Sequence, residues 1–342
     1  MKTVHLFFAG AAVMLAAVSC VKTQTIHDET SVELGFKAAV NVAPASKAGM
    51  WTPPGPELNG SSLGTYNEYV IYAAASADGS PKYFDTEADP FGGQLFAYFD
   101  DGAKWFPAIE DAGTYVKEHI YWPFGGVKVD FLACALTPAA KEALAPTFHD
   151  ETHAREFSIY DWDTFVDQFD VMYAVANGCV PGTDGNVALN FQHAQALLAF
   201  TAKKSATTTV DLAINSITIQ DLDYEGTLTV DNYRSNLKAY WTISESADKF
   251  LYPAPTISFP YELSDTPIAV TTNLLIPEQD SKQIVINYSM GGRDFDYYLD
   301  VPRTTWEMGK KYTFNLEFSA AEITFTATVD DWTEVPDTQE IG

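Results

Sequence analysis

The chain has 342 residues, of which 46% are hydrophobic and 14% aromatic. At about 150 residues per domain, this length predicts two domains, each large enough to bury its own core. Acidic residues outnumber basic ones by 46 to 20, which gives a net charge of -26. A chain this acidic repels the phosphates of nucleic acids, so the composition argues against a nucleic-acid partner and names no other ligand.

The first 20 residues are typical of an export signal. Lys2 gives a positive start, an apolar run extends from Leu6 to Val18, and small residues lead to Cys20. The run is too short to cross a bilayer core about 30 Å thick as a helix. We expect residues 1–19 to be a lipoprotein signal peptide, Cys20 to carry the lipid, and residues 20–30 to form a linker. The alternative is an ordinary secretory signal with a chance cysteine.

The first predicted strand covers residues 31–40, where apolar residues alternate with other residues. The apolar row consists of Val32, Leu34, Phe36, Ala38 and Val40. Small residues, Pro and Gly follow and predict an exposed loop. Lys47 lies in this loop, where a protease could reach it, whereas Lys37 lies within the strand and is expected to be protected.

Short apolar segments separated by Gly, Pro, Asn and Asp continue through the rest of the chain, as in sandwiches of antiparallel sheets. We therefore predict an all-β protein of two tandem β-sandwich domains, with a boundary near Asp223 that gives domains of residues 31–222 and 223–342. A change of phase after Ile214 predicts a β-bulge. The other predicted strands are 68–74, 93–99, 115–122, 127–136, 171–176, 187–203, 210–222, 228–232, 237–243, 256–259, 268–275, 283–288, 295–299, 312–318 and 322–329.

Candidate catalytic and metal-binding groups give only weak signals. His149 and His153 have the spacing of a zinc-protease helix, but the residue after His149 is not the glutamate that such a site needs. His193 lies among apolar residues on a predicted strand and is expected to be structural. A further segment contains four aspartates that could bind calcium, but it does not have the glycine and the terminal glutamate of a calcium loop. These aspartates are Asp161, Asp163, Asp167 and Asp170. We predict no enzyme activity, no cofactor and no metal.

Cys134 and Cys179 remain after Cys20 is assigned to the lipid. An exported chain permits a disulfide between them, and two buried free thiols are the alternative. The sequence leaves this choice open.

Several segments, in this order, resemble the fimbrillin family of anaerobic oral and gut bacteria. Each segment combines apolar alternation with Gly, Pro, His or Trp at set places. The segments are Val187–His193 with Leu197–Phe200, Ile217–Leu222, Leu274–Gln279, Trp306–Phe314 and Ile323–Trp332. Together they span residues 187–332, and the N-terminal half matches only in pattern.

The resemblance implies two domains of transthyretin-like topology and a structural or adhesive role in a pilus. It implies a lipidated precursor on the outer membrane, from which a trypsin-like protease removes the first strand. A strand from another pilus subunit then fills the groove, and the fimbrium is extracellular. In this sequence the cut is expected after Lys47, and the removable strand carries the row from Val32 to Val40.

The C-terminal residues 333–342 alternate poorly, so they are expected to be a poor donor strand. This favours a tip or accessory position, unless the last core strand itself donates. A host protein or glycan is the expected ligand of an adhesive subunit. The rival hypothesis is a monomeric surface lipoprotein that stacks sugars on Trp51, Trp105 or Trp122, although core packing is favoured for Trp122.

Overall fold

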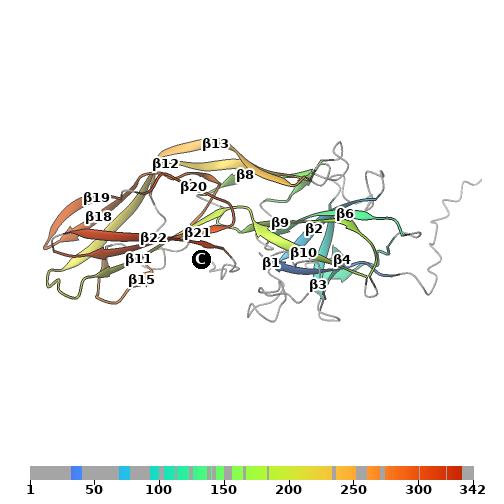
Figure 1. The fold of residues 1–342 in the computed structure, drawn as a ribbon, viewed down its shortest axis with the longest axis horizontal. Helices are drawn as coiled ribbons and strands as arrows, with labels where there is room; N and C mark the ends of the chain where they lie inside the picture. Colours follow the sequence, from blue (N-terminus) through green and yellow to red (C-terminus); the bar gives the residue numbers. More distant parts are fainter. Residues whose placement is uncertain are drawn as a thin grey trace, which may run out of the picture. The chain divides into compact units, whose positions relative to one another are not determined.

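The computed structural model describes residues 32–40, 69–77, 93–99, 104–111, 114–122, 126–136, 140, 144–149, 156–164, 167–182, 185–232, 236–251, 260–269, 274–299, 301–320 and 322–332. The signal peptide, Cys20, Lys47, Trp51, His153 and residues 333–342 lie outside this described part. Contacts group Val32–Gly342 into one compact unit, apart from residues 1–31. The described elements are 22 β-strands, so the protein is all-β as predicted (Figure 1). In the described part, no helix is long and apolar enough to span a membrane.

The first set of strands closes into a barrel. Its strands, in hydrogen-bonded order, are β1 (Gly35–Val40), β10 (Asn186–His193), β9 (Val171–Cys179), β6 (Val129–Leu136), β2 (Val70–Ala77), β3 (Gln94–Phe99) and β4 (Lys104–Asp111). β4 pairs back with β1 through Trp105 and Phe36, which completes the ring. β5 (Thr114–Lys117) pairs only with β4 and extends from it as a hairpin. The two facing sheets expected in this part of the chain are therefore not confirmed, because the described strands form one closed sheet.

The side chains that face the barrel interior explain why this sheet closes. Small residues lie on β2, β6 and β9, including Ala73, Ala133 and Ala174, while Phe96 and Phe131 fill the centre. A narrow barrel needs such a mixture, because large side chains on every strand would hold its walls apart. The alternation of apolar residues predicts the strands, but it does not distinguish a closed sheet from two sheets.

The later strands form two further sheets with a shared core. One consists of β11 (Ala196–Lys204), β15 (Ile268–Ala269), β16 (Leu274–Ile276), β21 (Lys310–Phe318) and β22 (Ile323–Asp331). The other consists of β7 (Thr147–Phe148), β8 (Glu156–Asp163), β12 (Leu212–Asp231), β13 (Lys238–Leu251), β14 (Tyr261–Glu262), β18 (Ile284–Met290) and β19 (Arg293–Leu299). Phe200 and Phe314 of the first sheet and Ile217 and Ile286 of the second belong to one buried cluster, so this part is sandwich-like.

β12 is a single strand of 20 residues, and Asp223, where we expected the domain boundary, lies inside it. The strand contains the predicted irregularity between Ile214 and Ser216 and further register shifts between Asp223 and Leu228. Its first half pairs with β18 and its second half with β8, while β13 runs along much of its length. The register shifts are therefore irregularities within one continuous strand.

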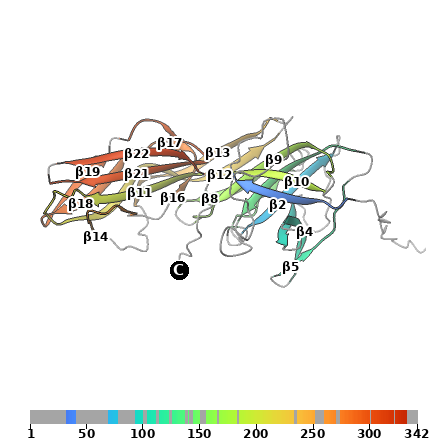
Figure 2. The same cartoon turned by 60° about the horizontal axis from the view of Figure 1, so that its bottom comes forward.

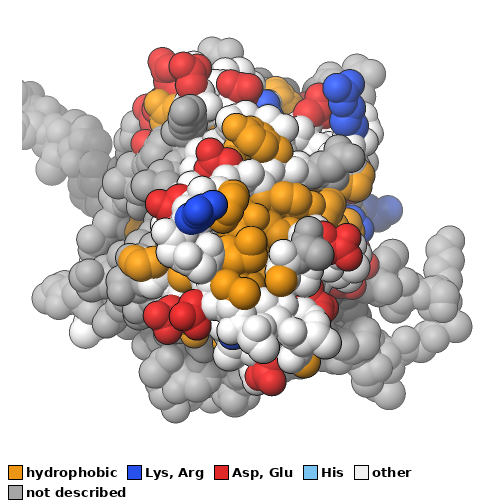
Figure 3. All heavy atoms as spheres, turned by 90° about the vertical axis from the view of Figure 1, so that its left-hand side faces the viewer, with side chains coloured by type: hydrophobic (Ala, Val, Ile, Leu, Met, Phe, Trp, Pro, Cys, Tyr) orange, Lys and Arg blue, Asp and Glu red, His pale blue; other side chains and the backbone are white. Residues whose placement is uncertain are grey.

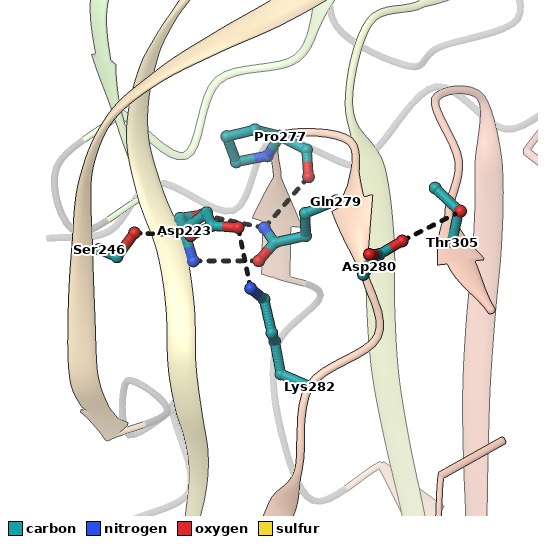
Figure 4. A network of polar contacts seen from close by, with 7 residues as sticks. All are labelled: Asp223, Ser246, Pro277, Gln279, Asp280, Lys282 and Thr305. Atoms are coloured by element: carbon teal, nitrogen blue, oxygen red, sulfur yellow. Dashed lines mark hydrogen bonds and ion pairs between the residues drawn. The ribbon is translucent and has the colours of Figure 1, made fainter. Parts of the chain in front are cut away.

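A polar network holds β12 at Asp223 (Figure 4). The side-chain amide of Gln279 accepts a hydrogen bond from the Asp223 backbone nitrogen (3.0 Å) and donates one to the Asp223 oxygen (2.9 Å). The Asp223 carboxylate accepts from Ser246 Oγ (2.6 Å) and pairs with Lys282 Nζ (2.9 Å). Gln279 belongs to β17 (Gln279–Asp280), which pairs with β20 (Thr305–Trp306). Asp223 is thus tied to β13 and β17.

A third core lies against the outer face of the barrel. Leu132 and Leu136 of β6 belong to the same buried cluster as Trp162 of β8 and Leu228 of β12. β6 is therefore buried on both faces, which explains its nearly continuous apolar run.

Candidate functional site: the seat of the first strand

β1 has two unlike neighbours in the barrel (Figures 1 and 2). On one side it pairs in parallel with β10 over six residue pairs, from Gly35 with Asn186 to Val40 with Phe191. On the other side it meets β4 at a single pair, Phe36 with Trp105. We call this position between β10 and β4 the β1 seat.

The predicted apolar row of this strand points into the barrel where its side chains are described. Leu34, Phe36 and Ala38 are buried in the core, and Val32 packs partly against it. The Phe36 ring lies 4.3 Å from that of Phe96, between ring centroids. The backbone of Val40 belongs to the ladder with β10, and its side chain is outside the described set. Burying such a row stabilises the seat by about 1.5–3 kcal/mol per large apolar side chain.

The residues just before β1 are held by backbone hydrogen bonds. Leu34 N donates to the Ile120 oxygen (2.8 Å), and Trp122 N donates to the Val32 oxygen (3.0 Å). Gly185, directly before β10, lies against this segment with a φ of 70°. A Cβ at Gly185 would lie 2.0 Å from the Glu33 oxygen, so only glycine fits there.

Charges contribute little to the hold on β1. Glu33 Oε1 lies 2.6 Å from His119 Nδ1 and 3.5 Å from Lys117 Nζ, and His119 is well exposed. Ion pairs of this kind are usually worth less than about 1 kcal/mol. The seat therefore holds its strand mainly through backbone pairing and apolar burial, which any strand of suitable alternation could supply.

His193 is buried in a structural environment, as predicted. Its Nδ1 lies 2.8 Å and 3.0 Å from the two carboxylate oxygens of Asp170, and its ring stacks on Trp332 with 3.6 Å between centroids and 8° between planes. Its Nε2 has no hydrogen-bond partner among the residues that the structure describes. Sequence reasoning placed His193 on a strand, but it gave no sign that Asp170 and Trp332 would meet it.

The other candidates do not assemble into a site. His149 Nε2 lies 3.0 Å from Ser158 Oγ, and Asp163 and Asp167 bond to each other through their backbone and side chain. Within the described ranges, no group of three His, Cys, Asp or Glu side chains could hold a metal ion.

Two of the three tryptophans considered for sugar stacking are buried in the barrel core. Trp105 is 4% exposed and Trp122 is 5% exposed, and the Trp122 Nε1 donates to the Gly185 oxygen (2.8 Å). The core packing favoured for Trp122 is confirmed. Trp105 was wrongly considered as an exposed platform, because its place opposite Phe36 turns it into the barrel.

Cys134 and Cys179 are free thiols. Cys134 pairs with Tyr173 and Cys179 with Val129, at separate places on the ladder between β6 and β9. Burial, and to a lesser extent Asp170, raises the pKa of Cys134, while burial and Asp130 raise the pKa of Cys179 to about 11. Both thiols are therefore protonated and unreactive at neutral pH.

Known proteins resemble this chain in sequence pattern and in fold. A family model described as fimbrillin-like matches residues 85–332. A candidate cell adhesion protein from Bacteroides uniformis aligns with a TM-score of 0.53 and 16% identity, over 88% of this chain and 98% of that one. A similar candidate from Bacteroides ovatus gives 0.53 and 14%, over 90% and 99%. A fimbrial protein from Bacteroides vulgatus gives 0.51 and 11%, over 87% and 99%.

These structural likenesses concern the fold alone, because the identities are low. No curated protein matches the chain significantly. The family model covers more than half of the sequence, and it includes all the segments whose resemblance was noted above. The chain belongs to the fimbrillin-like family.

Proposed function

We propose that the protein is a pilus subunit that assembles at the cell surface by exchange of its first strand. In this proposal a protease cuts the loop after β1, β1 leaves, and a strand of another subunit takes the β1 seat. The observation that carries the proposal is the position of β1. It is the first described strand of the chain, it fills the core of a closed barrel, and one of its two sides is paired at a single position.

Removing β1 opens the barrel in a specific way. β10 loses its partner over Asn186–Phe191, and Leu34, Phe36 and Ala38 leave apolar space behind. A row of unpaired backbone groups next to apolar pockets is the template on which an extended strand binds by β-augmentation. The incoming strand supplies backbone hydrogen bonds and its own alternating apolar side chains.

The remaining parts of the proposal concern segments outside the described residues. Residues 1–19 are the signal peptide, Cys20 carries the lipid that holds the precursor at the outer membrane, and Lys47 is the processing site. Residues 333–342 serve poorly as a donor strand, which suits a tip or accessory subunit. The transthyretin-like topology is proposed for the sandwich-like part, and the boundary between the two domains stays a proposal.

Limited digestion of the chain without residues 1–20 tests this function. Trypsin should cut first after Lys47, and ladders of associated subunits should then appear on gels in proportion to protein concentration. Lys47→Ala should remove the first cut, whereas Lys37→Ala, within β1, should leave it unchanged. A cut chain that stays monomeric at all concentrations would refute strand exchange, and a first cut elsewhere would refute only the assignment of Lys47.

A second measurement tests the anchor. Cys20→Ala should leave the precursor unlipidated and shift it out of the outer-membrane fraction. Unchanged membrane association of this variant would contradict the lipid anchor and leave strand exchange unaffected.

A further inference from the structure

β10 depends on β1 more than any other barrel strand does. In the described part of the barrel, its ladder with β9 consists of two pairs, Gln192 with Tyr173 and His193 with Met172. In the ladders of the described strands, residues Asn186–Phe191 pair with β1. When β1 leaves, this stretch loses its ladder with β1, and the ladder pairs that remain to β10 lie at its C-terminal end, with β9.

At that end, His193 makes close contacts with two other segments of the chain. His193 is fully buried, bonds to both Asp170 carboxylate oxygens, and stacks face to face on Trp332. Asp170 lies immediately before β9, and Trp332 immediately follows β22, so the stack joins three separate segments. Trp332 N also donates to the Gly309 oxygen (2.8 Å), which fixes the indole above the imidazole.

The next two residues continue this attachment. Ala194 N donates to the Val171 oxygen (2.8 Å), and the Ala194 oxygen accepts from Trp241 Nε1 (2.7 Å). The Gln195 amide accepts from Val171 N (3.1 Å) and donates to the Phe169 oxygen (3.0 Å). Here the chain passes from β10 to β11, and each tie limits how far β10 can unravel when its other end is free.

The energetic reason for a strong anchor is the buried carboxylate. Asp170 is 3% exposed, and a carboxylate in such a place is costly unless it is paired. Loss of His193 would leave this charge without its partner, and loss of Trp332 would remove the surface against which the imidazole is held. The three side chains therefore stabilise one another as a unit.

We propose that the Asp170–His193–Trp332 stack is the anchor that keeps β10 in place while the β1 seat is empty. This inference rests on the proposed strand exchange and adds the residues that position the acceptor strand. Binding of an incoming strand at the β1 seat then also depends on the C-terminal strand, because Trp332 contacts His193 only when the end of β22 is docked. A subunit whose β22 end is displaced should accept a strand poorly.

The experiment uses the full chain from Cys20, with Cys20 replaced by Ser and a site for a sequence-specific protease placed between Val40 and Tyr69. After cleavage of the folded protein, a fluorescent peptide of residues 32–40 competes with β1 for its seat. Fluorescence anisotropy gives the peptide affinity, and hydrogen exchange reports protection of residues 186–191. His193→Ala and Trp332→Ala should each weaken peptide affinity about tenfold or more and expose these amides.

Two control variants distinguish a loss of β10 positioning from a general loss of protein stability. Trp332→Phe keeps an aromatic ring over His193 and should restore most of the affinity. Ile286→Ala removes a buried side chain from the core of the sandwich-like part and should lower the melting temperature without changing peptide affinity.

The possible results are distinct. Equal affinity and equal protection in the unaltered chain and in Trp332→Ala would overturn the anchor while leaving strand exchange intact. A loss of affinity as large for Ile286→Ala as for Trp332→Ala would also overturn it. No peptide uptake by the unaltered cleaved chain would overturn the proposed function itself, together with the role of the anchor in it.

Discussion

Single glutamine side chains replace backbone pairing at several places where strands bend or end. Gln279 binds the backbone nitrogen and oxygen of Asp223, and Gln168 does the same for Leu275, at 2.9 Å and 3.2 Å. Gln195 bridges Val171 and Phe169. An amide carries both a donor and an acceptor, so it can satisfy two backbone groups that have no strand beside them.

The amide of Gln279 gives the first prediction at the residue scale. Gln279→Leu keeps the size of the side chain but leaves the Asp223 backbone groups without these partners. We expect a loss of about 1–3 kcal/mol in the free energy of unfolding, measured by chemical denaturation. Ser246→Ala is the matched control, because it removes an exposed hydrogen bond to the same Asp223 and should cost less than about 0.5 kcal/mol. Equal effects of the two variants would contradict this role of Gln279.

The hydrogen-bond partners of such residues could not be predicted from the sequence. The segment from Leu274 to Gln279 was noted for its resemblance, but nothing in it shows that Gln279 binds Asp223, 56 positions away. The same holds for His193, where the apolar neighbours predicted a structural residue correctly. The partners Asp170 and Trp332 come from distant segments, so only the folded chain identifies them.

At the scale of elements, alternation predicted the strands well where one face is buried. β1 and β21 follow their apolar rows closely. The run at 187–203 was read as one strand, yet it forms β10 and β11 with a break at Ala194 and Gln195. Both strands are apolar because they face different cores, so periodicity alone could not reveal the break.

β12 shows a different case. The sequence predicted separate strands at 210–222 and 228–232, whereas the structure has one strand from Leu212 to Asp231. A Cβ at Gly226 would lie 2.8 Å from the Thr242 oxygen of β13, so the glycine permits close approach within one long strand. A glycine in a strand can therefore mark a packing contact instead of a turn.

The contact between Gly185 and the start of β1 can be tested by comparing substitutions at two glycines. Gly185 and Gly178 both have positive φ, but a Cβ at Gly185 would collide with Glu33 and Val32, whereas one at Gly178 would meet nothing within 4 Å. Gly178→Ala should cost about 1 kcal/mol through backbone strain alone. Gly185→Ala should cost clearly more and should speed hydrogen exchange in residues 32–40.

The comparison isolates the contact with β1, because the backbone strain is common to both variants. Thermal unfolding gives the stability, and hydrogen exchange shows which strand is affected. The contact between Gly185 and the start of β1 would be refuted if exchange in residues 32–40 were the same in the two variants.

At the scale of the whole molecule, the edge strands differ in how they resist pairing with other chains. Among the described strands, β13, β19 and β22 each pair on one side only. Charged residues lie along the first two, such as Lys238 and Glu245 on β13 and Arg293 on β19. β22 pairs with β21 over nine residues without a bulge and has no charged residue from Ile323 to Val329. Its residue Val329 lies on the same face as Phe325 but is 55% exposed. Charges, prolines and bulges are the usual protections of an edge, and this part of β22 has none of them.

An apolar surface also lies at one end of the sandwich-like part. Figure 3 shows apolar side chains gathered at the centre of the face that lies on the side of β18, β19 and β22 in Figure 1. Phe295 and Tyr298 of β19 are among the exposed large apolar residues. The net charge of -26 opposes close approach of two copies, and salt shortens the range of that repulsion from about 10 Å at 0.1 M to about 3 Å at 1 M.

Association through β22 should therefore depend on salt. We expect sedimentation velocity to show a monomer at low ionic strength and an increasing fraction of larger species as salt is raised, because repulsion weakens while the edge stays unprotected. Val329→Lys places a charge on β22 and should prevent the change. Tyr240→Lys adds the same charge to the β13 edge, where Tyr240 is 48% exposed, and should leave the association as it is. If the two variants responded alike to salt, net charge alone would govern the association, and β22 would have no special part in it.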